Sequence, residues 1–388
     1  MPSFSVLPGP EGFFIFRPRA GLSTQKPFRR TSGGTKLKDQ SMKKVLFVLL
    51  AAAGLSAGAV AHAAVITENF ATDPLSNGWR IFGNTNLFHP NPTNQNLEVT
   101  WDSAQPNSYF YHPLGTVLTR QDDFSVAFDL RLTDIASGTD ESMTGGFEIG
   151  LGFLNFPVAT GTNFLRGVYY PFSAPTGAVN LVEFDYFPPG YFPDFGPVSA
   201  TTTPTLISSN GAFAPYQYIP YEIELPTNVL FHVTMTYTAS NQTLVTILTT
   251  NGLPYLHLLD ITLTDPGNSG FSEADDFRLD TISINSYSDA GQDPIYGSSV
   301  LAHGIVDNFV VTVPPPPVLN LSGSFSPSNW QAQFISQSNW LYTLERTTNF
   351  VSWTDISPAI PGNGTNLFIP DTNAPADKAF YRVSAQRP

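Results

Sequence analysis

Two carboxylates stand two positions apart in the segment 182–187, which reads VEFDYF. Its apolar and aromatic residues are typical of a β-strand, in which successive side chains point to opposite faces of the sheet. Glu183 and Asp185 are therefore expected on one face, with Val182 and Phe184 packed on the other. Such a pair could bind a metal ion or a sugar, could transfer protons in catalysis, or could face solvent on a strand that buries only its apolar side.

The segment that follows is rich in aromatic rings and is stiffened by prolines. Flat rings in a rigid loop suit stacking on a pyranose ring, whereas the alternative is that these rings pack on one another. Together with the two carboxylates, the rings form our set of candidate carbohydrate-binding residues. The set is Glu183, Asp185, Tyr186, Tyr191, Phe192 and Phe195.

The sequence excludes several other kinds of site. It has no cysteine, which rules out disulfides, thiolate metal sites and cysteine nucleophiles. Its six histidines are scattered, and it has neither a Gly-x-Ser-x-Gly elbow nor a phosphate-binding glycine loop. Because Lys378 is the only lysine after Lys44, catalysis by a lysine amine is excluded for the large domain defined below.

The elements that must position the candidate residues are β-strands. Apolar residues alternate with polar ones over 124–132 and 229–237, and over 147–153 they alternate with Gly150 and Gly152. These two glycines indicate either a close approach of backbone or an open concave surface. No window of a dozen residues shows helical periodicity, and Asn-Gly turns separate the runs, so we predict antiparallel strands in two packed sheets.

Four consecutive prolines at 314–317 divide the chain. A polyproline stretch is stiff and cannot donate hydrogen bonds to a sheet, so we predict a linker there. It separates a large domain at 64–313 from a module at 318–388, in which short strands such as 340–345 are again separated by glycine and proline. The predicted fold class is all-β in both parts.

The amino-terminal region contains an export signal. The basic start Met-Lys-Lys at 42–44 is followed by an apolar run and by Ala-His-Ala at 61–63, the pattern of a secretory signal peptide. Residues 1–41 are then expected to be an extension that arises from a start codon assigned too far upstream. We expect the mature protein to be secreted or on the cell surface, with no membrane insertion after the signal is removed.

The net charge of the mature chain limits the classes of molecule that it is expected to bind. After residue 63 the sequence has nine basic and 29 acidic residues, which is a formal charge of −20. Such a field repels nucleic acid and anionic surfaces, so neutral ligands and cations are the favoured partners. The sequence gives no indication of the oligomeric state.

The Glu-x-Asp strand at 183–185 resembles a strand of the concanavalin A-like lectin and glucanase superfamily, and the resemblance covers about 64–313. It implies a jelly-roll β-sandwich. In family 16 glycoside hydrolases this motif continues to an acid/base residue, which would fall here at Phe187 or Pro188. Neither can donate a proton to a leaving group, so the resemblance implies a protein without hydrolase activity.

In legume-type lectins of the same superfamily, a similar strand supplies ligands for a manganese and calcium pair. Glu183 and Asp185 match that strand, and Asp194 could stand for a later ligand. No histidine occurs between Asp185 and Phe231, so the resemblance implies a calcium site with oxygen ligands only.

The two ends of the large domain are similar to the first and last strands of jelly-roll carbohydrate-binding modules. In those modules an early glutamate and a late aspartate hold a structural calcium ion, which implies Ca²⁺ at Glu68 and Asp307 here. Pairing of the strands at 66–70 and 304–310 is the alternative reason for their sequences. The module at 318–388 is similar to small immunoglobulin- or fibronectin type III-like sandwiches at the ends of secreted bacterial proteins.

These observations favour a secreted, non-catalytic, lectin-like protein that binds a neutral polysaccharide or glycan. A structural or adhesive protein of the cell surface, without a ligand pocket, is the second hypothesis. A divergent glycoside hydrolase is the third. The sequence does not identify the glycan.

Overall fold

The computed structural model describes residues 63–137, 148–166, 178–192, 196–214, 223–265, 270–290, 299–326, 329–375 and 379–387. The predicted upstream extension, and the export signal apart from its last residue, lie outside these ranges. Among the described residues, no helix has the length and apolar character needed to cross a bilayer.

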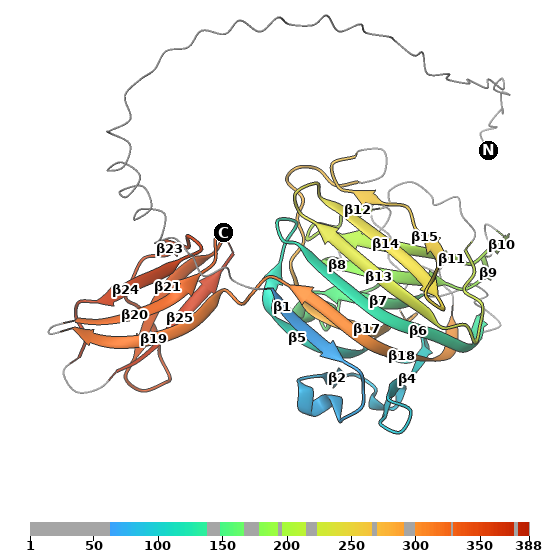
Figure 1. Cartoon of the computed structure of the whole chain (residues 1–388), viewed down its shortest axis with the longest axis horizontal. Helices are drawn as coiled ribbons and strands as arrows, with labels where there is room; N and C mark the ends of the chain where they lie inside the picture. The colour runs from blue at the N-terminus through green and yellow to red at the C-terminus, as the bar shows by residue number, and fades with distance from the viewer. Residues whose placement is uncertain are drawn as a thin grey trace, which may run out of the picture. The chain divides into compact units, whose positions relative to one another are not determined.

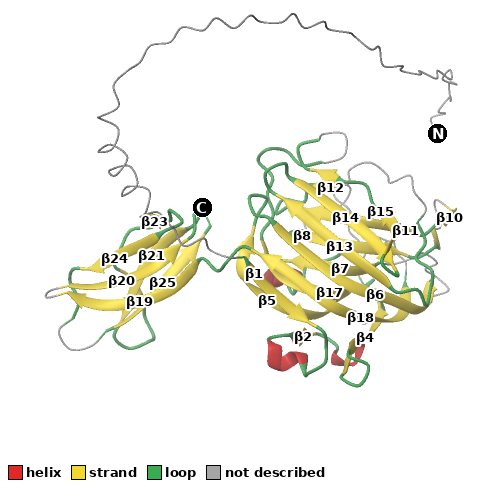
Figure 2. Ribbon diagram, in the orientation of Figure 1, coloured by secondary structure: helices red, strands yellow, loops and turns green. Residues whose placement is uncertain are grey.

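The chain folds almost entirely into β-strands, as the alternating sequence predicts (Figure 2). The strands of the large sandwich are β1 Ala64–Glu68, β2 Arg80–Phe82, β3 Phe88–Asn91, β4 Asn96–Asp102, β5 Ser108–Leu118, β6 Phe124–Ser137, β7 Ile149–Leu154, β8 Leu181–Phe187, β9 Gly190–Phe192, β10 Gly196–Val198, β11 Thr201–Ile207, β12 Phe213–Ala214, β13 Phe231–Thr238, β14 Thr243–Thr250, β15 Leu253–His257, β16 Ile261–Thr262, β17 Leu279–Ser286 and β18 Val300–Val313. The described helices are single turns: η1 Pro74–Asn77, η2 Thr85–Leu87 and α2 Phe156–Ala159.

Two sheets form the large sandwich (Figure 1). One has the strand order β15-β14-β13-β6-β18-β4-β3, with β1 beside β18 and β16 beside β14, and the other has the order β12-β11-β8-β7-β17-β5-β2. Neighbours in both sheets are antiparallel. The central pairs β13-β6, β6-β18, β18-β4, β7-β17 and β17-β5 join strands that are distant in sequence, which is the connectivity of a jelly roll. The fold class is therefore all-β with a jelly-roll sandwich, as predicted.

The predicted pairing of the first and last strands of this domain is confirmed. Strand β1 runs antiparallel to β18, with Ala64 opposite Val313 and Glu68 opposite Phe309. The segments that carry Glu68 and Asp307 are thus neighbours in space although they are far apart in the sequence.

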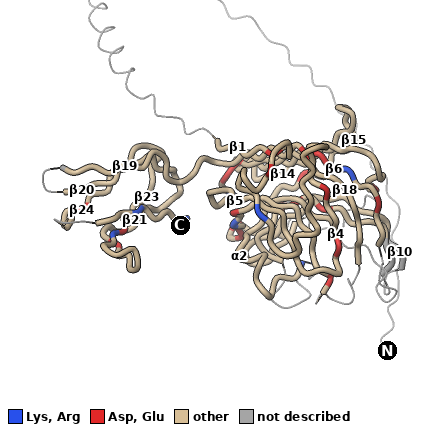
Figure 3. The backbone as a smooth tube through the Cα atoms, turned by 90° about the horizontal axis from the view of Figure 1, so that it is seen from below, with Lys and Arg blue, Asp and Glu red and all other residues tan. Residues whose placement is uncertain are grey.

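Acidic residues are spread over the large sandwich, and basic residues are few (Figure 3). All five basic residues of 64–313 lie in described segments of the chain. Two of them, Arg120 and Arg166, are buried, with 6% and 7% of their surface exposed. Because a buried guanidinium must be paired with hydrogen-bond acceptors, these two residues mark polar sites inside the domain.

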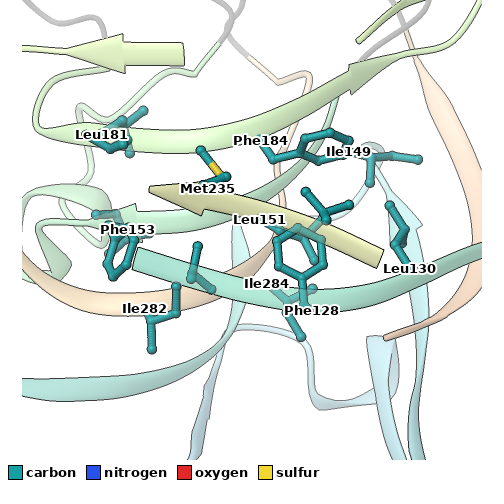
Figure 4. Close-up of a cluster of buried hydrophobic side chains, with 14 of the residues drawn as sticks. Phe128, Leu130, Ile149, Leu151, Phe153, Leu181, Phe184, Met235, Ile282 and Ile284 are labelled. Atoms are coloured by element: carbon teal, nitrogen blue, oxygen red, sulfur yellow. The ribbon is translucent and has the colours of Figure 1, made fainter. Parts of the chain in front are cut away.

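The core lies between the two sheets. Figure 4 shows Phe128 and Leu130 of β6 and Met235 of β13 against residues of the opposite sheet, among them Leu151 of β7 and Phe184 of β8. Along β6 buried residues alternate with partly buried ones from Phe124 to Leu132, as the period-two pattern predicts. Burial of these apolar side chains is the main force that holds the two sheets together, because the chain has no disulfide.

The carboxyl-terminal part is a second, smaller sandwich of antiparallel strands. Its strands are β19 Val318–Ser326, β20 Asn329–Ser336, β21 Leu341–Thr347, β22 Thr354–Asp355, β23 Ile360–Pro361, β24 Asn366–Asp371 and β25 Phe380–Gln386. One sheet has the order β19-β20-β24, and in the other β21 pairs with β22, β23 and β25. Its core includes Phe334, Tyr342 and Ile369. The prolines at 314–317 lie between β18 and β19 and belong to no strand.

Candidate functional site

The candidate carboxylates lie in the middle of the seven-stranded sheet, on the face turned away from the core. Strand β8 runs between β7 and β11, and β7 runs between β8 and β17. Gly150 of β7 is opposite Asp185 on one side and opposite Asn285 of β17 on the other. Gly152 is opposite Glu183 in the same way. Since neither glycine has a side chain, the groups on the neighbouring strands can lean over β7.

Both carboxylates contact one guanidinium. Arg166 Nε donates to Oε1 of Glu183 at 2.6 Å, and Arg166 Nη2 donates to Oδ2 of Asp185 at 2.8 Å. The prediction that the two carboxylates share a face of the strand is thus confirmed. The alternative that they face solvent is wrong, because both side chains have 0% of their surface exposed.

A third carboxylate completes this ion cluster. Oε2 of Glu148, the residue before β7, lies 3.1 Å from Nη2 of Arg166, and Glu148 is also buried. Oε2 of Glu183 accepts hydrogen bonds from Nδ2 of Asn285 at 2.9 Å and from the hydroxyl of Tyr287 at 2.8 Å. We call Glu148, Arg166, Glu183, Asp185, Asn285 and Tyr287 the Arg166 cluster.

The two glycines of β7 are required by this arrangement. A Cβ atom on Gly150 would lie 2.9 Å from the ring of Tyr287 and 3.0 Å from Oε2 of Glu183. A Cβ atom on Gly152 would lie 2.4 Å from the carbonyl oxygen of Val182, which real structures do not tolerate. Of the two possibilities that the sequence left open, a close approach of backbone is the one observed.

Arg166 is positioned by the segment that follows β7. Asn155 caps α2 by accepting a hydrogen bond from the backbone N–H of Val158, and the hydroxyl of Tyr109 donates to the carbonyl of Ala159 at 3.0 Å. Ring contacts cover the same face: Phe156 of α2 stacks on Tyr111 of β5, with 4.2 Å between ring centroids. The segment is therefore fixed on the outer face of the sheet and delivers the arginine to the carboxylates.

The charges of the Arg166 cluster do not balance. Three carboxylates surround one guanidinium. Three buried oxygens have no hydrogen-bond partner among the residues that the structure describes: Oε1 of Glu148, Oδ1 of Asp185 and Oδ1 of Asn285. Burial, and after it the charge of Glu183, raises the pKa of Asp185 to about 8, although Arg166 acts in the opposite direction. Burial also raises the pKa of Glu148.

The aromatic residues of the predicted site do not lie together in the structure. Tyr186 is only 1% exposed and packs in the core between the sheets, so no sugar can stack on its ring, and its assignment to the binding site is corrected. Tyr191 lies in β9 and its backbone pairs with Pro197 of β10, in a two-stranded hairpin that belongs to neither large sheet. Phe192 ends β9, whereas Phe195 lies outside the described residues.

The second predicted site is at Glu68 and Asp307. Oε1 of Glu68 accepts from the backbone N–H of Phe70 at 2.7 Å, and its Oε2 accepts from Nδ2 of Asn77 at 2.9 Å. Burial raises the pKa of Asp307, and the negative charges of Asp129 and Glu68 act in the same direction. The described residues contain no group of three or more histidine, aspartate or glutamate side chains arranged to hold a metal ion.

A cavity of about 620 Å³ opens beside this second site. Its walls include Glu68, Asn69, Asn77, His112 and Asn308, so its lining is mainly polar. The first and last strands of the sandwich meet here, and Glu68 fixes the turn that follows β1. Strand pairing and formation of this turn are therefore sufficient reasons for the sequence around Glu68 and Asp307.

The sequence did not identify Arg166, Glu148, Asn285 or Tyr287 as part of a site. The composition offered one signal for Arg166. Arginine is rare in this acidic domain, so an arginine there is expected to pair with one or more of the many carboxylates. The register that brings Asn285 to Glu183 depends on β17, about 100 residues later, and no local pattern shows it.

No protein-family model matches the chain, and no curated protein matches it. Solved structures with a similar fold include peanut lectin with a nonapeptide, 15% identical, with a TM-score of 0.38 over 65% of this chain and 99% of that one. Basic winged bean lectin with Tn-antigen is 11% identical, with a TM-score of 0.36 and coverage of 65% and 99%. The lectin from Bauhinia forficata in complex with GalNAc is 13% identical, with a TM-score of 0.35 and coverage of 65% and 100%. Likenesses of this size carry no conclusion about function.

Proposed function

We propose that the large sandwich binds a neutral glycan through the hairpin of β9 and β10, and that it does so without hydrolysis. The observation that carries this proposal is the position of the hairpin at the end of β8. Strand β8 is paired on both sides and its carboxylates are bound to Arg166. Among the described strands, β9 and β10 of the hairpin that follows pair only with each other. A loop that is held by a rigid strand but lies outside the sheets is a common place for a binding site.

The chemistry of the hairpin favours an uncharged sugar as the ligand. Tyr191 and Phe192 supply aromatic rings, and Pro188, Pro189 and Pro197 restrict the backbone around them. A chain with a formal charge of −20 after residue 63 has no reason to attract an anionic glycan. Each stacked ring could add about 1 kcal/mol beyond simple burial, so we expect millimolar to micromolar dissociation constants.

The burial of the carboxylates supports a function without hydrolysis. A retaining glycosidase needs two carboxyl groups roughly 5 Å apart at the substrate, and one must donate a proton to it. Glu183 and Asp185 are fully buried and bound to the same guanidinium, so neither is available to a sugar in this structure. The hypothesis of a divergent hydrolase therefore gains no support from the geometry.

Affinity gel electrophoresis of the mature protein in neutral polysaccharides, including β-glucans and galactans, tests the proposal. We expect the wild type to be retarded and the variant Tyr191→Ala/Phe192→Ala to migrate freely, because the stacking rings are gone. Phe325→Ala is the matched control, since it removes an exposed ring from the small sandwich and should leave retardation unchanged. Added sodium chloride should change the binding little, because no charge pairing with the sugar is involved.

Two outcomes would contradict the glycan proposal. If the folded wild type binds no neutral glycan, the alternative of a structural or adhesive surface protein takes its place. If the double variant loses its native circular dichroism spectrum, the rings of β9 belong to the packing of the domain and not to a binding surface.

We further propose that the protein is exported and that the mature chain begins at Ala64. The support is the signal-like sequence at 42–63, which ends one residue before β1 begins. Expression with the natural amino terminus, followed by amino-terminal sequencing of the extracytoplasmic fraction, should find Ala64 first. Mature protein that still contains residues before Met42 would contradict both the cleavage site and the expected start of the chain.

A further inference from the structure

The Arg166 cluster disagrees with the metal site that the resemblance to legume-type lectins implies. That site would use Glu183 and Asp185 as ligands. Here nitrogens of Arg166 lie 2.6 and 2.8 Å from oxygens of these two residues. Calcium or a transition metal would need the same oxygens at about 2.0–2.6 Å, a position that the guanidinium already fills. The residues present therefore do not fit a metal ion while Arg166 is in place.

We propose that Arg166 is a permanent internal cation that takes the place of a metal ion and gathers the three carboxylates around it. The site is then held together without metal. This inference is independent of glycan binding, because it concerns how the sheet is stabilised and not which ligand the surface takes.

The surroundings of Arg166 are suited to a planar organic cation. Its Nε and Nη2 atoms address two different carboxylates, which uses the forked donor geometry of a guanidinium. Its Cζ atom lies 5.7 Å from the ring centroid of Tyr287, a cation–π distance. A ring face attracts a guanidinium but is not a ligand for calcium or manganese, so the position of Tyr287 favours the arginine.

The backbone beneath the cluster provides the space that the side chain needs. Gly150 stands between Asp185 and Asn285 in the sheet, and any side chain there would collide with Tyr287 and Glu183. The ring and the carboxylates can thus lie directly over β7. The guanidinium remains charged at every pH at which proteins fold. It is also covalently attached to the chain, so a chelator cannot remove it as it can remove a metal ion.

A second buried arginine in the same domain is also surrounded by oxygen atoms, although these are neutral carbonyls. Nη1 of Arg120 donates to the backbone carbonyls of Ser272, at 2.8 Å, and of Glu273, at 3.3 Å, as well as to that of Asp275. Nη2 of Arg120 donates to the side chain of Gln242. Carbonyl oxygens that converge on one point are typical of calcium loops, and here they converge on a guanidinium. Two of the five basic residues in this acidic domain thus act as internal cations.

The variant Arg166→Ser tests the inference, because it removes the cation and leaves space among the carboxylates. We expect its melting temperature to fall by roughly 6–20 °C, since one partner of a buried ion cluster is lost. Calcium or manganese should then raise the melting temperature of Arg166→Ser in a saturable way, and by more than it raises that of the wild type. The triple variant Arg166→Ser/Glu183→Gln/Asp185→Asn is the matched control. It should lack this added response and keep only the calcium response that the wild type shows.

The wild type, in contrast to Arg166→Ser, should hold no metal ion at Glu183 and Asp185. Metal analysis after purification should find no ion that is lost in the variant Glu183→Gln/Asp185→Asn, and a chelator should have no effect that depends on these two residues. A chelator-induced fall in melting temperature that persists in Glu68→Gln but disappears in Glu183→Gln/Asp185→Asn would overturn the inference. An Arg166→Ser protein as stable as the wild type would overturn it as well.

If Arg166→Ser does not fold, Arg166→Lys decides the question. Lysine keeps the charge but lacks the fork that reaches two carboxylates, so it should fold with a lowered melting temperature that metal ions do not restore. Restoration of Arg166→Lys by calcium or manganese to the stability of the wild type would show that the site prefers a metal ion, and the inference would fail.

Discussion

Asp185 is held between charges of opposite sign. Its Oδ2 atom accepts a hydrogen bond from Arg166. Glu183 lies on the same face of β8, and Glu148 shares the same nitrogen of the guanidinium. Burial and the charge of Glu183 raise the pKa of Asp185 to about 8, and burial raises that of Glu148. The folded protein therefore keeps a proton on Asp185 at neutral pH.

The stability of the protein should depend on this proton. An aspartate in the unfolded chain has a pKa near 3.9, and the folded pKa of Asp185 is higher, about 8. Folding therefore takes up a proton between these values, so the contribution to stability is fully present below about pH 4 and is lost as the pH rises to about 8. We expect Asp185→Asn, which cannot ionise, to lose less stability than the wild type between pH 5 and pH 8.

Melting temperatures measured by circular dichroism across this pH range check that prediction. Glu224→Gln is the control, because Glu224 is an exposed carboxylate of the same domain. Its melting temperature should follow that of the wild type at each pH. If the Asp185→Asn and wild-type curves stay parallel from pH 5 to pH 8, the proton is not held by Asp185. The surrounding groups that act with Asp185 and must be intact in this comparison are Glu183, Arg166, Thr205 and Glu148.

At the scale of elements, strand β8 separates what a local sequence pattern determines from what it leaves open. The period-two rule correctly placed Glu183 and Asp185 on one face and Val182 and Phe184 on the other. The same rule puts Tyr186 on the core face, two positions beyond Phe184, and the structure buries it there. The prediction of Tyr186 as a binding residue was wrong because it grouped this ring with the loop that follows. Tyr186 is still part of strand β8 and follows its alternation of faces.

The remaining members of the Arg166 cluster could not be predicted from local patterns. Glu148 precedes β7, Arg166 follows α2, and Asn285 is on β17, so three separate connections bring them to Asp185. Strand order in a jelly roll does not follow the sequence, and the register between β7 and β17 is fixed by the packing of the whole core. The all-β class and many of the strands were predictable, whereas the composition of the site was not.

At the scale of the whole chain, charge is distributed very unevenly. Residues 64–313 contain 25 acidic and five basic side chains, a formal charge of −20, while residues 318–388 contain four of each. The acidic residues are spread over the large sandwich (Figure 3). Two of its five arginines are buried and paired, so few basic groups remain at the surface to offset the acidic charge. Repulsion among these carboxylates opposes folding of the large sandwich and not of the small one.

Ionic strength and calcium should therefore act on the large sandwich by two separable routes. Charges more than about 10 Å apart are largely screened at 0.1 M salt. Sodium chloride should therefore raise the melting temperature of the large sandwich and leave that of the small one unchanged. The calcium ion expected at Glu68 and Asp307 stays a prediction. To be recognised, it must raise the melting temperature by more than screening alone does. An ion present at about 100 times its dissociation constant stabilises by about 2.7 kcal/mol, or roughly 5–11 °C for a domain of this size.

Calorimetry in calcium chloride and in magnesium chloride at equal ionic strength separates the two routes. Specific binding predicts a higher melting temperature in calcium, lost on chelation and absent from Glu68→Gln/Asp307→Asn, because hard oxygen ligands at the meeting of β1 and β18 would close the sandwich. Glu183→Gln/Asp185→Asn should keep the calcium response, since Arg166 and not a metal ion occupies that site. Equal melting temperatures in the two salts would mean that screening is the only effect of calcium. Glu68 would then stabilise the domain only through its hydrogen bonds to Phe70 and Asn77.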